Sequence, residues 1–159
     1  MTGFSEKLNA ALVSLFEGAT DGGIEHRPIR VEKHYESAYE ISCHIGFFEA
    51  NGKQAGVALL NINKADLREM WTDVLQLPLP DGADATEIAT ELTNMIAGNA
   101  SANFFDTGIR MHISLPHIIE CGHQIRLSTL NRDDFHYFEF FNQKLRFNWV
   151  LCSYDVIEF

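Results

Sequence analysis

The chain has 159 residues, 46% hydrophobic and 21% charged, which is typical of one globular domain that can bury a core. Its formal net charge of −10 argues against a nucleic-acid partner and against an anionic membrane surface. No apolar run approaches the roughly 20 residues that span a bilayer, and the N-terminus lacks a signal pattern. The cysteines Cys43, Cys121 and Cys152 are widely spaced and predict free thiols. We therefore expect a cytoplasmic protein.

The first part of the chain predicts one helix and three strands. Apolar residues recur with helical spacing over 4–17, and glycines follow them. Residues 28–33, 39–49 and 55–63 are rich in Ile, Val, Tyr and Phe and predict strands. Asn51-Gly52 is a hairpin signal between the last two strands. The continuous apolar run in the third strand predicts a central strand that is covered on both faces.

The second part predicts two further helices and another set of strands. Residues 64–76 predict a helix, and a proline-rich loop separates it from the longest predicted helix, over 83–105. The buried side of the shorter helix should carry Leu67, Met70, Trp71, Val74 and Leu75. Strands are expected near 109–115, 123–131, 135–142 and 145–154, with a turn at Asn142-Gln143 before the last one. Their alternation of aromatic and polar residues suits a sheet with one covered face.

This order of elements predicts an α+β fold in which long helices pack on one face of an antiparallel sheet. Each half of the chain reads as a helix followed by three or four strands, which hints at a pseudo-repeat of helix-plus-three-strand halves. The loop at 77–82 is too short to separate two domains, so we expect a single domain over residues 1–159.

The long helix begins clearly and has a defined core side. Asp84 stands three residues before Glu87, an arrangement that resembles a capping box. At roughly 100° per residue, the apolar positions fall on one stripe that should face the core. This core stripe consists of Ile88, Leu92, Met95 and Ile96. Asn99 also projects toward the core stripe, so its amide is expected to bond buried backbone.

A second stripe of the same helix carries polar groups. It consists of Glu87, Glu91, Asn94 and Gly98. Asn is a mediocre helix former, and a mid-helix Gly costs about 1 kcal/mol relative to Ala. The use of both residues suggests that the amide serves another purpose and that another backbone, from a partner or a neighbouring strand, approaches Gly98. The stripe therefore predicts a surface that receives a partner closely.

The residues of this helix also carry a family resemblance. The string Glu91-Leu-Thr-Asn94-Met-Ile-Ala-Gly98-Asn-Ala is followed by Ile-Ser-Leu-Pro at 113–116 and by Gly122. This pattern resembles the CheC/CheX/FliY family of bacterial chemotaxis phosphatases, and it looks most like the CheX branch. The resemblance covers about 83–122; the rest of the chain is compatible in length and pattern.

The resemblance implies a phosphatase that hydrolyses the aspartyl phosphate of a CheY-type response regulator. Asn94 would orient the attacking water, and Glu91 would pair with the partner's active-site lysine, while Glu87 and Gly98 would contact the partner. The Mg²⁺ ion would belong to the response regulator, so no metal or other cofactor of the chain's own is implied. CheX-like relatives form homodimers, and the aromatic C-terminal strands are plausible for that contact.

Two other functions stay open at this point. The first is a non-catalytic module that binds a response regulator or a flagellar-switch component; a pure docking surface, however, has no need of the Asn94 amide. The second is a small-molecule sensor that kept the fold and lost the chemistry. In the simplest interpretation of the pair, Glu91 and Asn94 are a solvated helix face.

Two further sets of residues have spacings or chemistry that resemble a site. Glu6 and Asn9 repeat the Glu-x-x-Asn spacing, but they differ in rotational phase and lack the Met-Ile-Ala-Gly continuation. We read them as surface residues rather than a second site. The grouping of His112, His117, Cys121 and His123 matches no paired metal-binding motif, so no metal site is expected.

Overall fold

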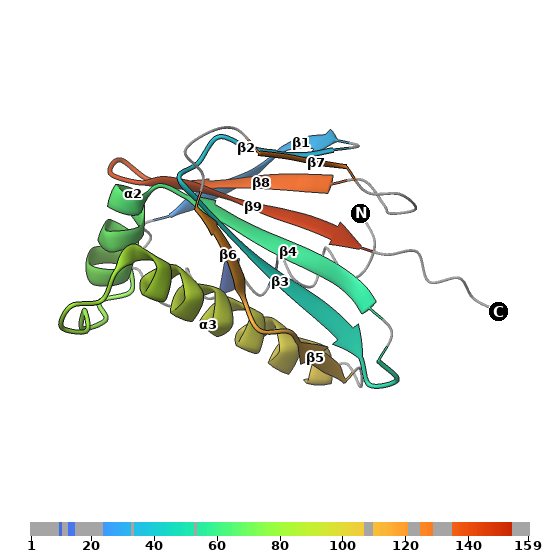
Figure 1. Ribbon diagram of the computed structural model, residues 1–159. Coiled ribbons are helices and arrows are strands. Elements are labelled where there is room, and N and C mark those ends of the chain that lie inside the picture. The colour runs from blue at the N-terminus through green and yellow to red at the C-terminus, as the bar shows by residue number, and fades with distance from the viewer. Residues whose placement is uncertain are drawn as a thin grey trace.

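The structure is a computed structural model, and it describes residues 10, 13–14, 24–32, 34–52, 54–106, 110–120, 125–128 and 135–153. Within these residues, an antiparallel sheet fans out behind the long helix (Figure 1). The strands are β1 (Glu25–Glu32), β2 (His34–Ser37), β3 (Ile41–Glu49), β4 (Gln54–Ile62), β5 (Met111–Ile113), β6 (His117–Glu120), β7 (Ile125–Ser128), β8 (Phe135–Phe141) and β9 (Arg146–Ser153). The helical elements are α2 (Lys64–Glu69), the π-helix η1 (Met70–Val74) and α3 (Ala85–Asp106).

Seven strands form the main sheet in the order β1-β8-β9-β4-β3-β5, with β6 also paired to β3, and β2 pairs with β7 in a second sheet. Every pairing is antiparallel. The α+β prediction with an antiparallel sheet is confirmed. Of the described helices, however, only α3, with 22 residues, is long.

The strand β4 lies at the centre and is buried on both faces, as predicted. Ala58, Leu60 and Ile62 belong to the core under the helices, while Val57 and Leu59 pack on the other side in a cluster with residues of β2 and β8. The same is true of β9, whose residues contribute to both clusters. The prediction of one covered face is therefore wrong for β9, because the two-stranded sheet places β2 over its second face.

Two strands were not expected from the sequence. The short strand β2 lacks a strong apolar pattern and is defined by its pairing with β7. The strand β6 follows β5 along the free edge of β3, and Ser114 joins the two: its amide donates to the Gly46 carbonyl, and the Gly46 amide donates to the Ser114 hydroxyl, both at 2.9 Å. Tertiary pairing, and not local propensity, forms both strands.

The helix predicted over 64–76 is two elements. Its α-helical part is short, and the wider η1 turn follows, in which the Leu75 amide donates to the Met70 carbonyl at 2.9 Å. Gln76 adopts a positive φ of 52° and ends the helix. The predicted buried side is confirmed at Leu67, Met70, Trp71 and Val74, whereas Leu75 is half-buried.

Several predictions fall on residues that are only partly described. Residues 10, 13 and 14 are helical, and the rest of the predicted N-terminal helix, with Glu6 and Asn9, lies outside the described residues. The pseudo-repeat and the single domain stay predictions. Cys43 and Cys152 are buried cysteines with no disulfide between them, and Cys121 lies outside the described residues. None of the helices described is both long and apolar enough to span a bilayer.

Candidate functional site

The helix α3 presents the two stripes that its sequence predicts. On the core stripe, Ile88, Leu92 and Ile96 are fully buried against the sheet, and Met95 is half-buried beside them. The opposite side of the helix therefore has a fixed orientation, because rotation of α3 would expose these apolar side chains.

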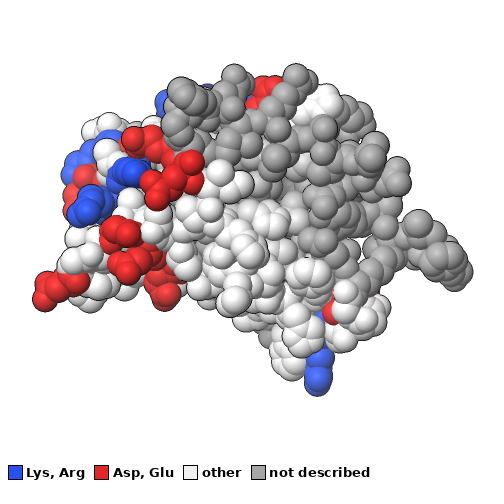
Figure 2. Space-filling model, in the orientation of Figure 1, with Lys and Arg blue, Asp and Glu red and all other residues white. Residues whose placement is uncertain are grey.

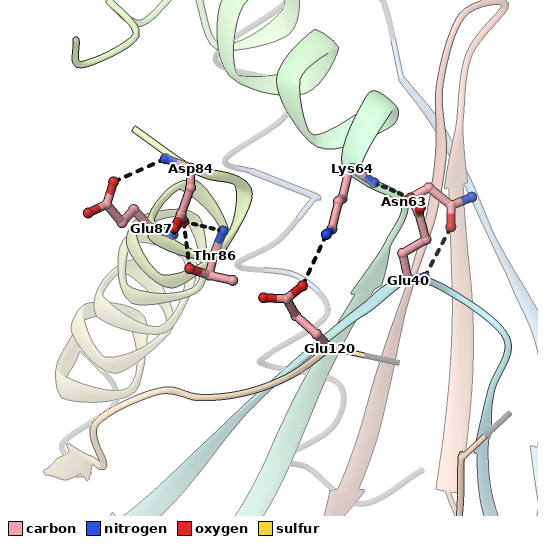
Figure 3. Close-up of polar contacts among 7 residues, drawn as sticks. All are labelled: Glu40, Asn63, Lys64, Asp84, Thr86, Glu87 and Glu120. Atoms are coloured by element: carbon pink, nitrogen blue, oxygen red, sulfur yellow. Dashed lines mark hydrogen bonds and ion pairs between the residues drawn. The ribbon is translucent and has the colours of Figure 1, made fainter. Parts of the chain in front are cut away.

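The beginning of α3 is a complete capping box (Figure 3). The Glu87 amide donates to Oδ1 of Asp84 at 2.9 Å, and the Asp84 amide donates back to Oε2 of Glu87 at 3.1 Å. The hydroxyl and the amide of Thr86 donate to the same Asp84 oxygen. These hydrogen bonds, that of the Thr86 hydroxyl first, hold the pKa of Asp84 below its usual value. The predicted capping box is confirmed.

Replacing Asp84 with alanine is expected to lower the melting temperature by a few degrees at neutral pH, because the first turn loses its acceptor. Asp84→Asn keeps an acceptor and should recover part of the loss. The folded pKa of Asp84 is lowered, so its contribution is present above the unfolded pKa and disappears as the pH falls through the folded value. The melting curves of Asp84→Ala and wild type should therefore differ at neutral pH and converge at strongly acidic pH.

The proposed site residues share one exposed side of α3. Glu87 and Glu91 are exposed, Asn94 is half-buried, and Gly98 is exposed. Glu87 also serves the capping box, a structural role that the sequence alone already suggested. Within the described part of the chain, neither Glu91 nor Asn94 forms a side-chain hydrogen bond, so both groups are available to an external partner.

The structure leaves one of the two explanations for Gly98, and it places Asn99 differently from expectation. A Cβ added at Gly98 would meet nothing within 4 Å, so no neighbouring strand of the described structure explains the glycine. Asn99 is exposed. The prediction that its amide bonds buried backbone is wrong, because the core contact at this level of the helix is made by Ala97 and Ala100, which are fully buried.

Replacing Gly98 with alanine is expected to raise the free energy of unfolding by about 1 kcal/mol, since the added methyl meets open space and alanine favours the helix. Chemical denaturation measures this change. The reverse substitution at the exposed Ala102 of the same helix, Ala102→Gly, should cost a similar amount. Destabilisation by Gly98→Ala would contradict the open surface described here.

A groove of about 730 Å³ lies beside the first half of this surface. Its apolar wall includes Trp71 of η1, Leu77 and Pro78 of the following loop, and Ile88 and Met95 of α3. Its acidic side carries Asp81, Glu87 and Glu91. The η1 turn thus flanks the acidic part of the stripe and leaves Asn94 outside the groove lining. The sequence analysis did not identify this groove, and the closely spaced Pro78 and Pro80 are its strongest signal.

Figure 2 shows acidic side chains gathered at the end of the molecule where α2 and the beginning of α3 lie. At the same end, Lys64 of α2 pairs with Glu120 of β6 at 3.0 Å (Figure 3), and this partner raises the pKa of Lys64. No three His, Cys, Asp or Glu side chains of the described residues lie together as a metal site requires. Cys121 and His123 are outside those residues, so the expectation of no metal site stays a prediction.

The arrangement suits chemistry on a group that a partner carries. The half-buried amide of Asn94 can donate and accept hydrogen bonds and hold a water molecule, and the carboxylate of Glu91 one turn away can pair with a cation. Glu91 borders the groove, and Asn94 lies outside its lining.

The comparisons identify the family. A sequence profile described as "Chemotaxis phosphatase CheX" matches residues 41–140, more than half of the chain, and the chain belongs to the CheX family. A comparison with curated proteins gives no match.

Solved structures share the fold. A CheC-like superfamily protein from Shewanella sp. PV-4 superposes with a TM-score of 0.74 at 18% identity, over 98% of this chain and 99% of the other. The chemotaxis protein CheX from Desulfovibrio desulfuricans gives 0.67 at 18% identity, over 94% and 98%. A CheX–CheY–BeF₃–Mg²⁺ complex from Borrelia burgdorferi gives 0.65 at 14% identity, over 98% and 100%.

Proposed function

We propose that the protein is a phosphatase that hydrolyses the aspartyl phosphate of a CheY-type response regulator in chemotaxis or related two-component signalling. The observation that carries the proposal is the pair of the exposed Glu91 and the half-buried Asn94, one turn apart on a helix whose orientation its core stripe fixes. Membership of the CheX family and the similarity to a CheX that is complexed with CheY support it.

In this proposal the response regulator supplies the phosphoryl group and its Mg²⁺ ion. Phosphoryl transfer needs mainly positioning and stabilisation of charge. Asn94 enters the partner's site and holds a water in line with the phosphorus, as a glutamine does in small GTPases. Glu91 pairs with the partner's active-site lysine and fixes the docking register. Glu87 lies on the same side and contacts the partner.

Gly98 has a place in the same contact. The space beside Gly98 is open, and no contact in the described structure explains why a residue of low helix propensity stands in the middle of α3. A partner backbone that approaches α3 closely would account for it.

The protein acts in the cytoplasm, where the regulator is found, and it is a homodimer.

The direct test is the rate at which a phosphorylated CheY-type regulator loses phosphate with and without this protein. A panel of regulators from the same organism identifies the substrate. The proposal expects acceleration that saturates with protein concentration. Binding of several regulators that still decay at their intrinsic rates would instead make the protein a non-catalytic binding module.

A further inference from the structure

We propose that the groove between η1, the loop after it and α3 is a second docking site for the response regulator, which receives an apolar side chain flanked by a lysine or arginine. This inference rests on the proposed function, because it names how the same partner is held beside Glu91. The groove determines the affinity and the orientation of the regulator, whereas Asn94 acts in the chemical step.

The shape of the groove is held before any partner arrives. The Trp71 indole donates from Nε1 to the Pro78 carbonyl at 3.1 Å, and the Leu77 amide donates to the Trp71 carbonyl at 3.1 Å. The Ala83 amide donates to the Pro80 carbonyl at 3.1 Å, which closes the loop onto the start of α3. Proline fixes φ at two positions of this short loop. Little ordering is therefore needed on binding.

The chemistry of the lining defines the occupant. Trp71, Leu77 and Pro78 offer apolar surface to a hydrophobic side chain, and a volume of about 730 Å³ is within the range of ligand sites. Asp81, Glu87 and Glu91 border this surface, and among the described residues no lysine or arginine lines it. A purely apolar occupant would leave these carboxylates without a cationic partner, and an acidic occupant would be repelled by them.

Neighbouring cations do not neutralise the acidic border. Lys64 pairs with Glu120, and neither Asp81 nor Glu91 forms a salt bridge with any residue that the structure describes. Glu91 belongs both to this groove and to the stripe with Asn94. A partner segment in the groove is therefore continuous with the surface where the phosphoryl group is expected.

Three charge variants test the proposal against a regulator loaded with beryllium fluoride and Mg²⁺. Asp81→Lys inverts one border charge, Leu77→Lys places a cation on the apolar wall, and Glu32→Lys makes the same charge change on β1, at the end of the strand that pairs with Phe135. Asp81 and Glu32 are exposed, and Leu77 is half-buried. Melting curves establish that each variant is folded.

Asp81→Lys and Leu77→Lys are expected to raise Kd about tenfold or more, with slower association for Asp81→Lys. Glu32→Lys should stay within about twofold of wild type. The length of β1, roughly 20 Å, lies between Glu32 and the end of the sheet where Lys144 pairs with Asp73 of η1, and this distance exceeds the Debye length of about 8 Å at physiological salt. The Kd of wild type should also rise as the salt concentration is raised from about 0.01 M to 1 M, because the Debye length falls from roughly 30 Å to 3 Å. The Kd of Asp81→Lys should rise less over the same range.

Turnover at saturating protein separates this proposal from the function on which it rests. Both groove variants should raise the protein concentration that gives half-maximal acceleration of phosphate loss, in line with their higher Kd. Equal Kd values for the three variants would overturn the groove proposal and leave the groove to another class of ligand, even if the phosphatase is real. Conversely, a wild-type protein that binds without accelerating hydrolysis would overturn the catalytic claim, while the Kd series still decides the groove. A wild-type protein that binds no regulator would overturn both.

Discussion

Replacing Asn94 with alanine is expected to reduce the acceleration of phosphate loss by about 100-fold or more. Removal of one positioned group that acts on the reacting atoms has an effect of this order. Asn94 forms no side-chain hydrogen bond within the described structure, and alanine is the better helix former, so the variant should fold at least as well as wild type. The measurement is the single-turnover decay of the phosphorylated regulator at saturating protein.

A matched control is available on the same helix. Asn103→Ala removes an exposed asparagine of α3, two turns or more beyond Asn94, and should leave the rate unchanged. Binding of the beryllium fluoride form should be similar for wild type and Asn94→Ala, because the amide acts on the water. Full activity of Asn94→Ala would remove this residue from the mechanism.

The second large effect is expected in a buried polar cluster between β2 and the main sheet. Oδ1 of the fully buried Asn61 accepts hydrogen bonds from the hydroxyls of Tyr35 and Ser42, the latter at 2.7 Å. Its amide donates to Oδ1 of Asn148 at 2.5 Å. Replacing Asn61 with alanine should lower the free energy of unfolding by about 2 to 4 kcal/mol, since it leaves buried partners unsatisfied.

Denaturant unfolding measures this loss, and Asn103→Ala again provides the comparison. That exposed substitution should be neutral or slightly stabilising, because it removes no buried hydrogen bond. Asn61→Ala should retain phosphatase activity at temperatures where it is folded. A loss below about 0.5 kcal/mol, the range of surface substitutions, would mean that water replaces the missing amide.

The helix α3 and the hairpins could be predicted because local chemistry determines them. Asp84 and Glu87 define the start of α3, and Asn51-Gly52 forms the expected turn, in which the Gly52 amide donates to the Glu49 carbonyl and φ of Gly52 is 85°. The turn at Asn142 is likewise confirmed by its hydrogen bonds to Leu145. Each signal lies within a few residues of the structure it specifies.

What the sequence did not reveal depends on contacts between distant segments. The strand β2 forms because it pairs with β7. Its Tyr35 packs on the second face of the main sheet, which the alternation of aromatic and polar residues did not predict to be covered. At Met70 the backbone changes from the α-helical to the π-helical hydrogen-bond pattern, and the two patterns differ little in the residues that they prefer. The groove follows from both the π turn and the loop, so periodicity could not predict it.

For the site, the sequence placed Glu87, Glu91, Asn94 and Gly98 on one side of a helix, and the structure has them there. It misplaced Asn99, because a rotation of roughly 100° per residue assigns a border position to either side with equal ease. In the structure, the small residues Ala97 and Ala100 face the core there. Trp71 was recognised as buried, but its contact with the acidic side of α3 requires the fold.

The central position of β4 has a consequence for hydrogen exchange. Both of its edges are hydrogen-bonded, to β3 and β9, and both of its faces are covered. Its amide hydrogens should therefore exchange with solvent only when the whole domain unfolds, whereas those of the exposed edge strand β1 exchange through local opening. Exchange rates at Val57 to Ile62 would therefore report the global stability of every variant above. A variant that loses activity while these amides stay protected has lost its function and kept its fold.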